Sequence, residues 1–296
     1  MDLTPAPLAV VGLGNMGGGM AAHLLDSGFA VTVHNRTAAK AEPLVARGAV
    51  AADSPEQAVK GQRTVLLSLS DERAVDEVLF KRLVPVLEPG CLVIDTSTVS
   101  PGYAREAAVR LAGHGLPRVE ACVVGNPFQA AKGELRVYVS GEEADVDRAR
   151  PVLDAIGSEV TYMGAPGAAT TIKLIFNTLL GVQVASMAEA VTYGVEAGLD
   201  RDLLLTAIAS SGFSSVVMRF RAELMRRSSY EPAFFRTVLM EKDLRLAVRS
   251  AREAGVELPV LERARERFEA VILAGEGDKD AAVIIEHPAG PAGGTH

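Results

Sequence analysis

Three glycines near the start of the chain have the spacing of a phosphate-binding turn. Gly12, Gly14 and Gly17 form the pattern Gly-x-Gly-x-x-Gly between an apolar run and a segment of helix-forming residues. In such a turn the first glycine permits a tight bend, the second lets the backbone approach a pyrophosphate, and the third lets helix and strand pack closely, while the helix N-terminus offers free N–H groups. We therefore predict a dinucleotide site, the alternative being ordinary turn glycines. Its expected cofactor contacts are Gly12, Leu13, Gly14, Asn15, Met16 and Gly17.

The residues after the second apolar run indicate which dinucleotide would bind. A carboxylate about 20 positions after the glycines bonds the ribose of NAD, whereas a neutral residue beside an arginine accommodates the 2′-phosphate of NADP. This chain has Asn35, Arg36 and Thr37 there. Arg36 could bind the phosphate bidentately, with Asn35 and Thr37 adding hydrogen bonds. NADP(H) is therefore favoured over NAD(H), the alternative being that Arg36 is a solvated loop residue.

A lysine in an apolar segment is the candidate for acid–base chemistry. Lys173 and Asn177 are four positions apart, so a helix would place them on one face. If that face meets the nucleotide domain, partial burial would lower the pKa of Lys173 towards neutrality and make it a competent general acid for a carbonyl oxygen. The alternative is that Lys173 extends its charge to water and Asn177 bonds the backbone.

The elements that must position these residues follow from the hydrophobic pattern. In the first half, short runs rich in Val, Leu and Ile alternate with amphipathic segments, which is typical of parallel strands linked by crossover helices. Strands are expected at residues 8–12, 30–34, 64–68, 92–95, 119–124, 136–140 and 159–162, and a helix at 18–27. Later helices are expected at residues 168–198, 200–209, 216–225, 237–254 and 259–274.

The predicted fold is therefore of the α/β class. It consists of an N-terminal Rossmann-like doubly wound sheet and a C-terminal all-helical domain, which are joined by a long interdomain helix. The expected domains are residues 1–165 for the dinucleotide and 166–286 for substrate and dimerisation. Residues 287–296 are rich in Gly, Pro and Ala and are expected to form a tail.

Composition excludes several classes of protein. With 296 residues, 48% hydrophobic and 23% charged, and a net charge of −7, the chain is neither disordered nor a basic nucleic-acid binder. Arg219, Arg221, Arg226 and Arg227 are interspersed with acidic residues and are expected on solvated helix faces.

The positions of the cysteines and the hydropathy pattern exclude further classes of protein. Cys91 and Cys122 cannot form a disulfide framework, and no Cys or His lies at zinc-ligand spacing from another, so no metal site is expected. The N-terminus lacks the pattern of a signal peptide. Polar residues interrupt the apolar region 174–188, which is shorter than the roughly 20 residues that cross a bilayer. We expect a cytoplasmic protein without a membrane partner.

Five signals, taken in order, resemble the β-hydroxyacid dehydrogenase family, which includes 3-hydroxyisobutyrate dehydrogenases and glyoxylate/succinic semialdehyde reductases. They are Val-Gly-Leu-Gly-Asn-Met-Gly at 11–17, Asn-Arg-Thr at 35–37, Asp-Thr-Ser-Thr-Val-Ser-Pro at 95–101, Lys173 with Asn177, and Glu-Lys-Asp-Leu-Arg-Leu-Ala at 241–247. The resemblance covers nearly the whole chain. It implies a 6-phosphogluconate dehydrogenase-like helical domain and assembly as a homodimer or homotetramer.

The resemblance also implies a role for each matching residue. Lys173 corresponds to the lysine that protonates the carbonyl oxygen as hydride arrives, and Asn177 to a residue that holds this lysine or the substrate. Further implied substrate contacts are Thr98, Phe235 and Asp243, and further implied cofactor contacts are Leu69, Ser70, Thr98 and Lys242. From the residues alone, Phe235 could equally be a core residue, and Lys242 and Asp243 an exposed helix pair.

One segment departs from the family. Where the family usually shows Asp-Ala-Pro-Val-Ser-Gly-Gly, residues 120–126 read Glu-Ala-Cys-Val-Val-Gly-Asn. Val124 replaces the serine that would bind a substrate carboxylate, a loss of about 1.5 to 3 kcal/mol. The expected substrate contacts here are Val124, Gly125 and Asn126. Either the amide of Asn126 replaces the lost hydrogen bond, or the pocket suits a less polar carbonyl compound. Cys122 is expected to be a packing residue.

The expected function is an NADP(H)-dependent oxidoreductase that transfers hydride between the nicotinamide and a small semialdehyde or keto compound and its hydroxy acid, with Lys173 as general acid or base. An imine reductase-like enzyme is the alternative of the same architecture. A non-catalytic NADP-binding interaction module is the alternative of another class.

Overall fold

The apolar runs of the first half form one sheet. In the computed structural model, which describes residues 6–289, the sheet has eight strands in the order β3-β2-β1-β4-β5-β6-β7-β8. All neighbouring pairs are parallel except β6 and β7, which are antiparallel. The strands are β1 Leu8–Val11, β2 Val31–His34, β3 Val50–Ala51, β4 Thr64–Leu67, β5 Leu92–Asp95, β6 Arg118–Val124, β7 Leu135–Ser140 and β8 Gly157–Tyr162.

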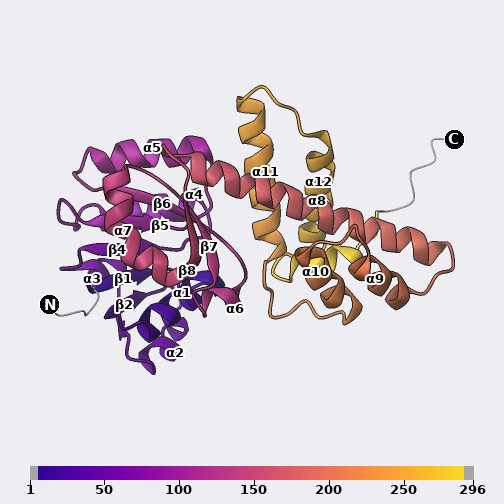
Figure 1. The fold of residues 1–296 in the computed structure, drawn as a ribbon, viewed down its shortest axis with the longest axis horizontal. Coiled ribbons are helices and arrows are strands. Elements are labelled where there is room, and N and C mark those ends of the chain that lie inside the picture. Colours follow the sequence, from indigo (N-terminus) through magenta and orange to yellow (C-terminus); the bar gives the residue numbers. More distant parts are fainter. Residues whose placement is uncertain (1–5, 290–296) are drawn as a thin grey trace. The chain divides into compact units, whose positions relative to one another are not determined.

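Alternation along the strands gives the sheet two apolar faces. Leu8 and Val10 belong to one buried cluster, and Ala9 and Val11 to another. The first cluster includes residues of α1 (Asn15–Asp26) and α7 (Glu143–Ile156), and the second includes residues of α3 (Pro55–Val59) and α5 (Pro101–Ala112). The remaining helices of this part are η1 Ala38–Lys40, α2 Glu42–Val45, α4 Glu72–Val75, the π-helix η2 Asp76–Leu83 and α6 Pro127–Ala130. Because helices cover both faces, the expected doubly wound sheet is confirmed (Figure 1).

The strand order reverses at β1 and β4, and this point locates a crevice. Ligands of open α/β sheets bind outside the carboxyl ends of the strands where the order reverses. The glycine turn follows β1, residues 68–70 follow β4, and residues 96–98 follow β5. The topology therefore brings three of the sequence-predicted segments to one edge of the sheet.

The chain forms two compact units, with the border between Lys173 and Leu174, inside helix α8 (Ala168–Glu196). The second unit is helical and consists of the rest of α8 with α9 Arg201–Ser210, α10 Val216–Arg226, α11 Thr237–Glu253, α12 Pro259–Leu273 and the 3₁₀ helix η3 Ala281–Glu286. These elements share a core that includes Val184, Met240, Leu244 and Phe268. Gly181 lets α11 approach closely, since a Cβ there would lie 2.7 Å from Leu244.

Most expected elements are present, with bounds shifted by a few residues. The first helix starts at Asn15 and not at residue 18, so it includes the second half of the glycine turn. The sequence missed β3, which has only two residues, and η3. Of the expected tail, residues 290–296 lie outside the described part of the chain. By length and composition α8 alone among the described helices could cross a membrane, a test that buried core helices also pass.

Candidate active site

The glycine turn has the shape that a pyrophosphate needs. Gly12 has φ +98°, and a Cβ there would lie 2.3 Å from the carbonyl oxygen of Ser68. A Cβ on Gly17 would lie 2.0 Å from the carbonyl oxygen of Gly12. At Gly14, by contrast, no atom lies within 4 Å of the Cβ position. The first and third glycines are thus required by packing, while the second faces open space at the N-terminus of α1, where an anion could approach.

The loop after β2 is tied to this turn. The amide oxygen of Asn35 accepts a hydrogen bond of 2.9 Å from the backbone N–H of Leu13, and its amide nitrogen donates to the carbonyl of Thr37 at 3.1 Å. Arg36 is exposed and forms no ion pair within residues 6–289. His34 bonds the carbonyl of Ala52 at 3.0 Å, as a residue at a strand end does. The loop therefore holds Arg36 beside the turn with its guanidinium available to an anion.

The loops after β4 and β5 hold each other. The backbone N–H of Leu69 donates to the hydroxyl of Ser97 at 3.0 Å, and Thr96 donates to the carbonyl of Leu67 at 2.7 Å. Ser70 is exposed and donates to Asp71 at 3.0 Å. Thr98 is half-buried in the same run. Leu69, Ser70 and Thr98 thus lie where the dinucleotide is expected.

Lys173 reaches the end of β6. Its Nζ donates a hydrogen bond of 2.9 Å to the carbonyl oxygen of Val123, and the residue is half-buried. Val124, Gly125 and Asn126 follow directly, so the structure places the lysine beside the segment that departs from the family pattern. All of these residues belong to the first unit.

Asn126 is committed to local structure. Its amide oxygen accepts the backbone N–H of Gln129 at 3.0 Å, and the Gln129 side chain accepts the N–H of Asn126 at 3.0 Å, forming a capping box at α6. The only donor of the Asn126 side chain, its amide nitrogen, is left to bond an anionic ligand. Gly125 has φ +151° and a Cβ there would lie 2.7 Å from Leu135.

Cys122 packs in the core of this region. It is 2% exposed, and its sulfur lies 3.7 Å from the hydroxyl of Thr170. Burial, reinforced by the charge of Glu120, raises the pKa of the Cys122 thiol well above its ordinary value. A thiol that stays protonated is a poor nucleophile, as expected of a packing residue.

A buried set of charges lies beneath Lys173, and sequence reasoning gave it no role. Arg118 and Glu120 in β6 are 6% and 1% exposed. Arg118 donates to Asp95 at 2.8 Å and lies 3.9 Å from Glu120. Glu120 in turn accepts backbone N–H groups of Gly167, at 2.7 Å, and of Thr170. The available signal was two charged residues in a strand that is otherwise apolar.

In the second unit three of the expected residues form one cluster. The amide nitrogen of Asn177 donates to Asp243 at 2.6 Å, and Lys242 pairs with Asp243 at 2.8 Å. The side chains of Lys242 and Asp243 are 11% and 4% exposed, so they are not an exposed helix pair.

Phe235 is half-buried against the core of the second unit. Its backbone N–H donates to Asp280 at 3.0 Å. Asp280 also pairs with Arg221, which is 5% exposed. The expectation that Arg221 lies on a solvated face is therefore wrong: a buried carboxylate compensates its charge.

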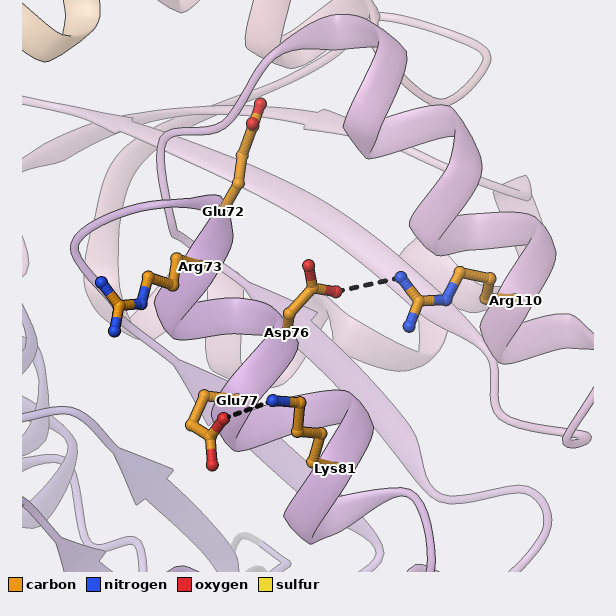
Figure 2. Close-up of a pocket in the computed structure, with 6 residues that line it drawn as sticks. All are labelled: Glu72, Arg73, Asp76, Glu77, Lys81 and Arg110. Atoms are coloured by element: carbon orange, nitrogen blue, oxygen red, sulfur yellow. Dashed lines mark hydrogen bonds and ion pairs between the residues drawn. The ribbon is translucent and has the colours of Figure 1, made fainter.

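A surface pocket is lined by a different set of residues (Figure 2). It is lined by Glu72, Arg73, Asp76, Glu77, Lys81 and Arg110. Four of its charges form two pairs: Asp76 accepts from Arg110 at 3.0 Å, and Glu77 from Lys81 at 2.8 Å. None of the predicted site residues lines it.

Comparisons with known proteins agree with the order of elements. Residues 7–164 match the family model of the NAD-binding domain of 6-phosphogluconate dehydrogenase. Residues 167–287 match a second family model, described as NAD-binding of NADP-dependent 3-hydroxyisobutyrate dehydrogenase.

Within the described residues, the structure contains no group of three or more His, Cys, Asp or Glu side chains that could hold a metal ion.

Individual relatives match over most of their length. Glyoxylate/succinic semialdehyde reductase 1 of Arabidopsis thaliana is 33% identical over 279 residues, which are 93% of this chain and 96% of that protein. The crystal structure of a 3-hydroxyisobutyrate dehydrogenase from Salmonella typhimurium has a TM-score of 0.90 at 30% identity and covers 96% of this chain and 100% of its own. The structure of Psf3 in complex with NADP+ has a TM-score of 0.85 at 26% identity, and the match covers 95% of this chain and 99% of that one.

The glycine turn at the switch point, the helical second unit and these matches lead to one assignment. The chain is an NAD(P)-binding oxidoreductase of the dehydrogenase/reductase type that acts on CH–OH and C=O groups, and it belongs to the β-hydroxyacid dehydrogenase family.

Proposed function

We propose that this protein is an NADP(H)-dependent reductase, or the reverse dehydrogenase, that interconverts a small semialdehyde or keto compound and its hydroxy acid, with Lys173 as the general acid or base. The observation that carries the proposal is the half-buried Lys173 amine, 2.9 Å from the Val123 carbonyl in the unit that contains the glycine turn. The amine is close to the ends of the strands, where a ligand of this fold binds.

The residues present fit a dinucleotide. Gly14 leaves space at the N-terminus of α1 for the pyrophosphate, and Leu69, Ser70 and Thr98 lie along the same edge of the sheet. The exposed guanidinium of Arg36, in a loop without a carboxylate, supports a preference for the 2′-phosphate. When bound, the nicotinamide supplies or accepts the hydride.

The chain itself supplies the proton. In the direction of reduction the carbonyl carbon gains a hydride, and the ammonium group of Lys173 gives a proton to the oxygen, which becomes the hydroxyl. The neutral amine then regains a proton from water. In the opposite direction the amine removes the hydroxyl proton. We also assign Asn177, Phe235 and Asp243 to the substrate and Lys242 to the cofactor.

The loop after β6 bears on the choice of substrate. The Val124 side chain offers no hydrogen bond to a carboxylate, and the only donor of the Asn126 side chain is its amide nitrogen. We propose that the substrate's end near Val124 is weakly polar. Relatives are named for glyoxylate, succinic semialdehyde and 3-hydroxyisobutyrate, which define the compounds to test first. We further propose that the protein acts in the cytoplasm as a homodimer or homotetramer.

A panel assay tests the proposal. Consumption of NADPH and of NADH is measured with glyoxylate, succinic semialdehyde and a cyclic imine, and NADP+ reduction with 3-hydroxyisobutyrate. We expect turnover of a carbonyl or hydroxy compound with NADPH preferred. Turnover of the cyclic imine alone would replace the proposal with an imine reductase. Thermal stabilisation by NADPH without turnover of any compound would indicate a binding module.

A further inference from the structure

The first turn of α8 begins at a buried carboxylate. Glu120 accepts the backbone N–H groups of Gly167, at 2.7 Å, and Thr170, and the hydroxyl of Ser140 accepts that of Ala169 at 2.9 Å. These are the donors that a helix leaves without partners at its N-terminus. Strands β6 and β7 thus cap α8 from outside the helix, and the charge of Glu120 lies at the positive end of the helix dipole.

This cap lies one turn before the catalytic candidate. Thr170 precedes Lys173 by three residues, and Lys173 Nζ bonds the carbonyl of Val123, three residues after Glu120 in the same strand. The helix start and the lysine tip are therefore both fixed to β6. A residue that holds the helix start determines where the amine lies.

The carboxylate is itself held in place. Arg118 lies 3.9 Å from Glu120, bonds Asp95 at 2.8 Å and donates to the carbonyl of Ala104 at 3.2 Å. Asp95 also accepts the N–H of Ser97, whose hydroxyl bonds Leu69 in the loop expected at the cofactor. One buried chain of contacts thus connects the cofactor loops to the start of α8.

We propose that Glu120 is a positioning residue for Lys173: by capping the first turn of α8 it holds the amine at the reacting carbonyl. This inference rests on the proposed role of Lys173. It assigns a function to a residue that is 1% exposed and acts through Lys173. Misplacing a catalytic group by about 1 Å can cost about 100-fold in rate.

A double-mutant cycle tests the proposal on kcat. Glu120→Ala, Lys173→Ala and the double variant are assayed with NADPH and succinic semialdehyde, or with the compound of the panel that is turned over fastest. We expect Glu120→Ala to lower kcat about 10- to 100-fold in the wild-type background. In the Lys173→Ala background the same substitution should lower kcat less than about 2-fold, because the effects of substituting residues that act as a unit do not add. Equal losses in both backgrounds would refute the positioning role. Full activity of Lys173→Ala would instead refute the proposed function.

Two further variants separate positioning from folding. Glu120→Gln keeps the size and one acceptor oxygen, and it takes the place of the alanine variant in the cycle if the latter does not fold. Glu120→Asp keeps the charge and should restore at least half of the lost kcat. If kcat of Glu120→Asp is no higher than kcat of Glu120→Gln, the charge of the carboxylate has no role in positioning Lys173.

Two readouts do not depend on turnover. Hydrogen exchange of the backbone amides of residues 167–173 should speed up at least 10-fold in Glu120→Ala, while the dissociation constant for NADPH, measured by fluorescence, stays within about 3-fold of wild type. Unchanged exchange in this segment would overturn the proposal. The matched control is Asp200→Ala, which removes a carboxylate cap from α9 in the second unit and should leave exchange at residues 167–173 and kcat unchanged.

Discussion

A lysine ammonium group donates a proton usefully only when it is held close to the atom that receives it. The hydrogen bond of 2.9 Å from Lys173 Nζ to the carbonyl oxygen of Val123 fixes the amine at the end of β6. This is the part of the sheet where we propose that the substrate binds.

We expect Lys173→Ala to lower kcat by about 100- to 10,000-fold, the usual effect of losing a general acid. Lys173→Arg should fail similarly, because a guanidinium keeps its charge and its proton at neutral pH. Steady-state kinetics on both variants, with NADPH affinity as the control for folding, checks this. Substantial turnover by the arginine variant would show that the charge matters and the proton does not.

Arg36 is the residue on which the cofactor preference depends. Loss of a hydrogen-bonded charge contact costs about 1.5 to 3 kcal/mol, so Arg36→Ala should raise the dissociation constant for NADPH about 10- to 100-fold. The constant for NADH, which lacks the phosphate, should change little. Fluorescence titration with both cofactors measures this. Arg47→Ala is the matched control, an exposed arginine that pairs with Asp26. Equal weakening of NADPH and NADH would contradict phosphate recognition.

Val124→Ser restores the hydroxyl that the family pattern has at this position. If a substrate carboxylate lies there, KM for an acid such as succinic semialdehyde should fall about 10-fold, by about 1.4 kcal/mol. Val124→Ala controls for the change of size. A serine variant no better than the alanine variant would place the carboxylate elsewhere.

At the scale of elements, the sequence predicted those whose pattern is continuous. The four-residue strands β1, β4 and β5 were found because each contains at least three consecutive buried apolar residues. Strand β3 was missed because its two residues are exposed and pair with β2 alone. The roles of Arg118 and Glu120 were missed because a charge in a strand becomes meaningful only when its partners, Asp95 and the start of α8, are known.

One ion pair between elements gives a prediction for pH. Glu56 of α3 accepts two hydrogen bonds from Arg82 of η2, at 2.6 and 2.8 Å. The hydrogen bond from Arg82 lowers the pKa of Glu56 to about 2, from 4.5. The carboxyl binds its proton more weakly in the folded state, so the pair stabilises the fold above about pH 4.5 and loses this effect as the pH falls towards 2.

Glu56→Gln should therefore reduce stability at pH 7 and have little effect at pH 2. Because the side chains of Arg82 and Glu56 are 41% and 32% exposed, solvent screens the pair, and we expect the free energy of unfolding to fall by about 0.5 to 1 kcal/mol at pH 7. Urea unfolding of both proteins at several pH values measures the difference. If the difference in free energy of unfolding between the two proteins is the same at pH 2 and at pH 7, the ion pair does not stabilise the fold through its charge.

At the scale of the molecule, the sequence selects candidate residues, whereas the contacts that hold them are visible only in the structure. The glycines and Lys173 were identified from spacing and from resemblance, and the structure places them in the first unit. The cluster of Asn177, Lys242 and Asp243 in the second unit could not be predicted from spacing, since 66 residues separate the bonded pair. Arg221 illustrates the same limit, because its partner Asp280 lies 59 residues further along the chain.

Asp280 shows how the second unit depends on one buried group. Its carboxylate pairs with Arg221 and accepts the backbone N–H groups of Phe234, Phe235 and Ala282, each at 3.0 Å. Removing it leaves a buried guanidinium and three N–H donors without their acceptor, so Asp280→Ala should destabilise this unit by about 3 to 5 kcal/mol.

Hydrogen exchange followed by segment distinguishes a local effect from a global one. In Asp280→Ala, exchange should speed up at residues 230–240 and 276–286, whereas residues 8–20 of the glycine turn should keep their protection. Because a ligand stabilises the unit that binds it, NADPH should still slow exchange at residues 8–20 in the variant. Equal loss of protection in both regions would mean that the two units unfold together and that Asp280 stabilises the whole chain.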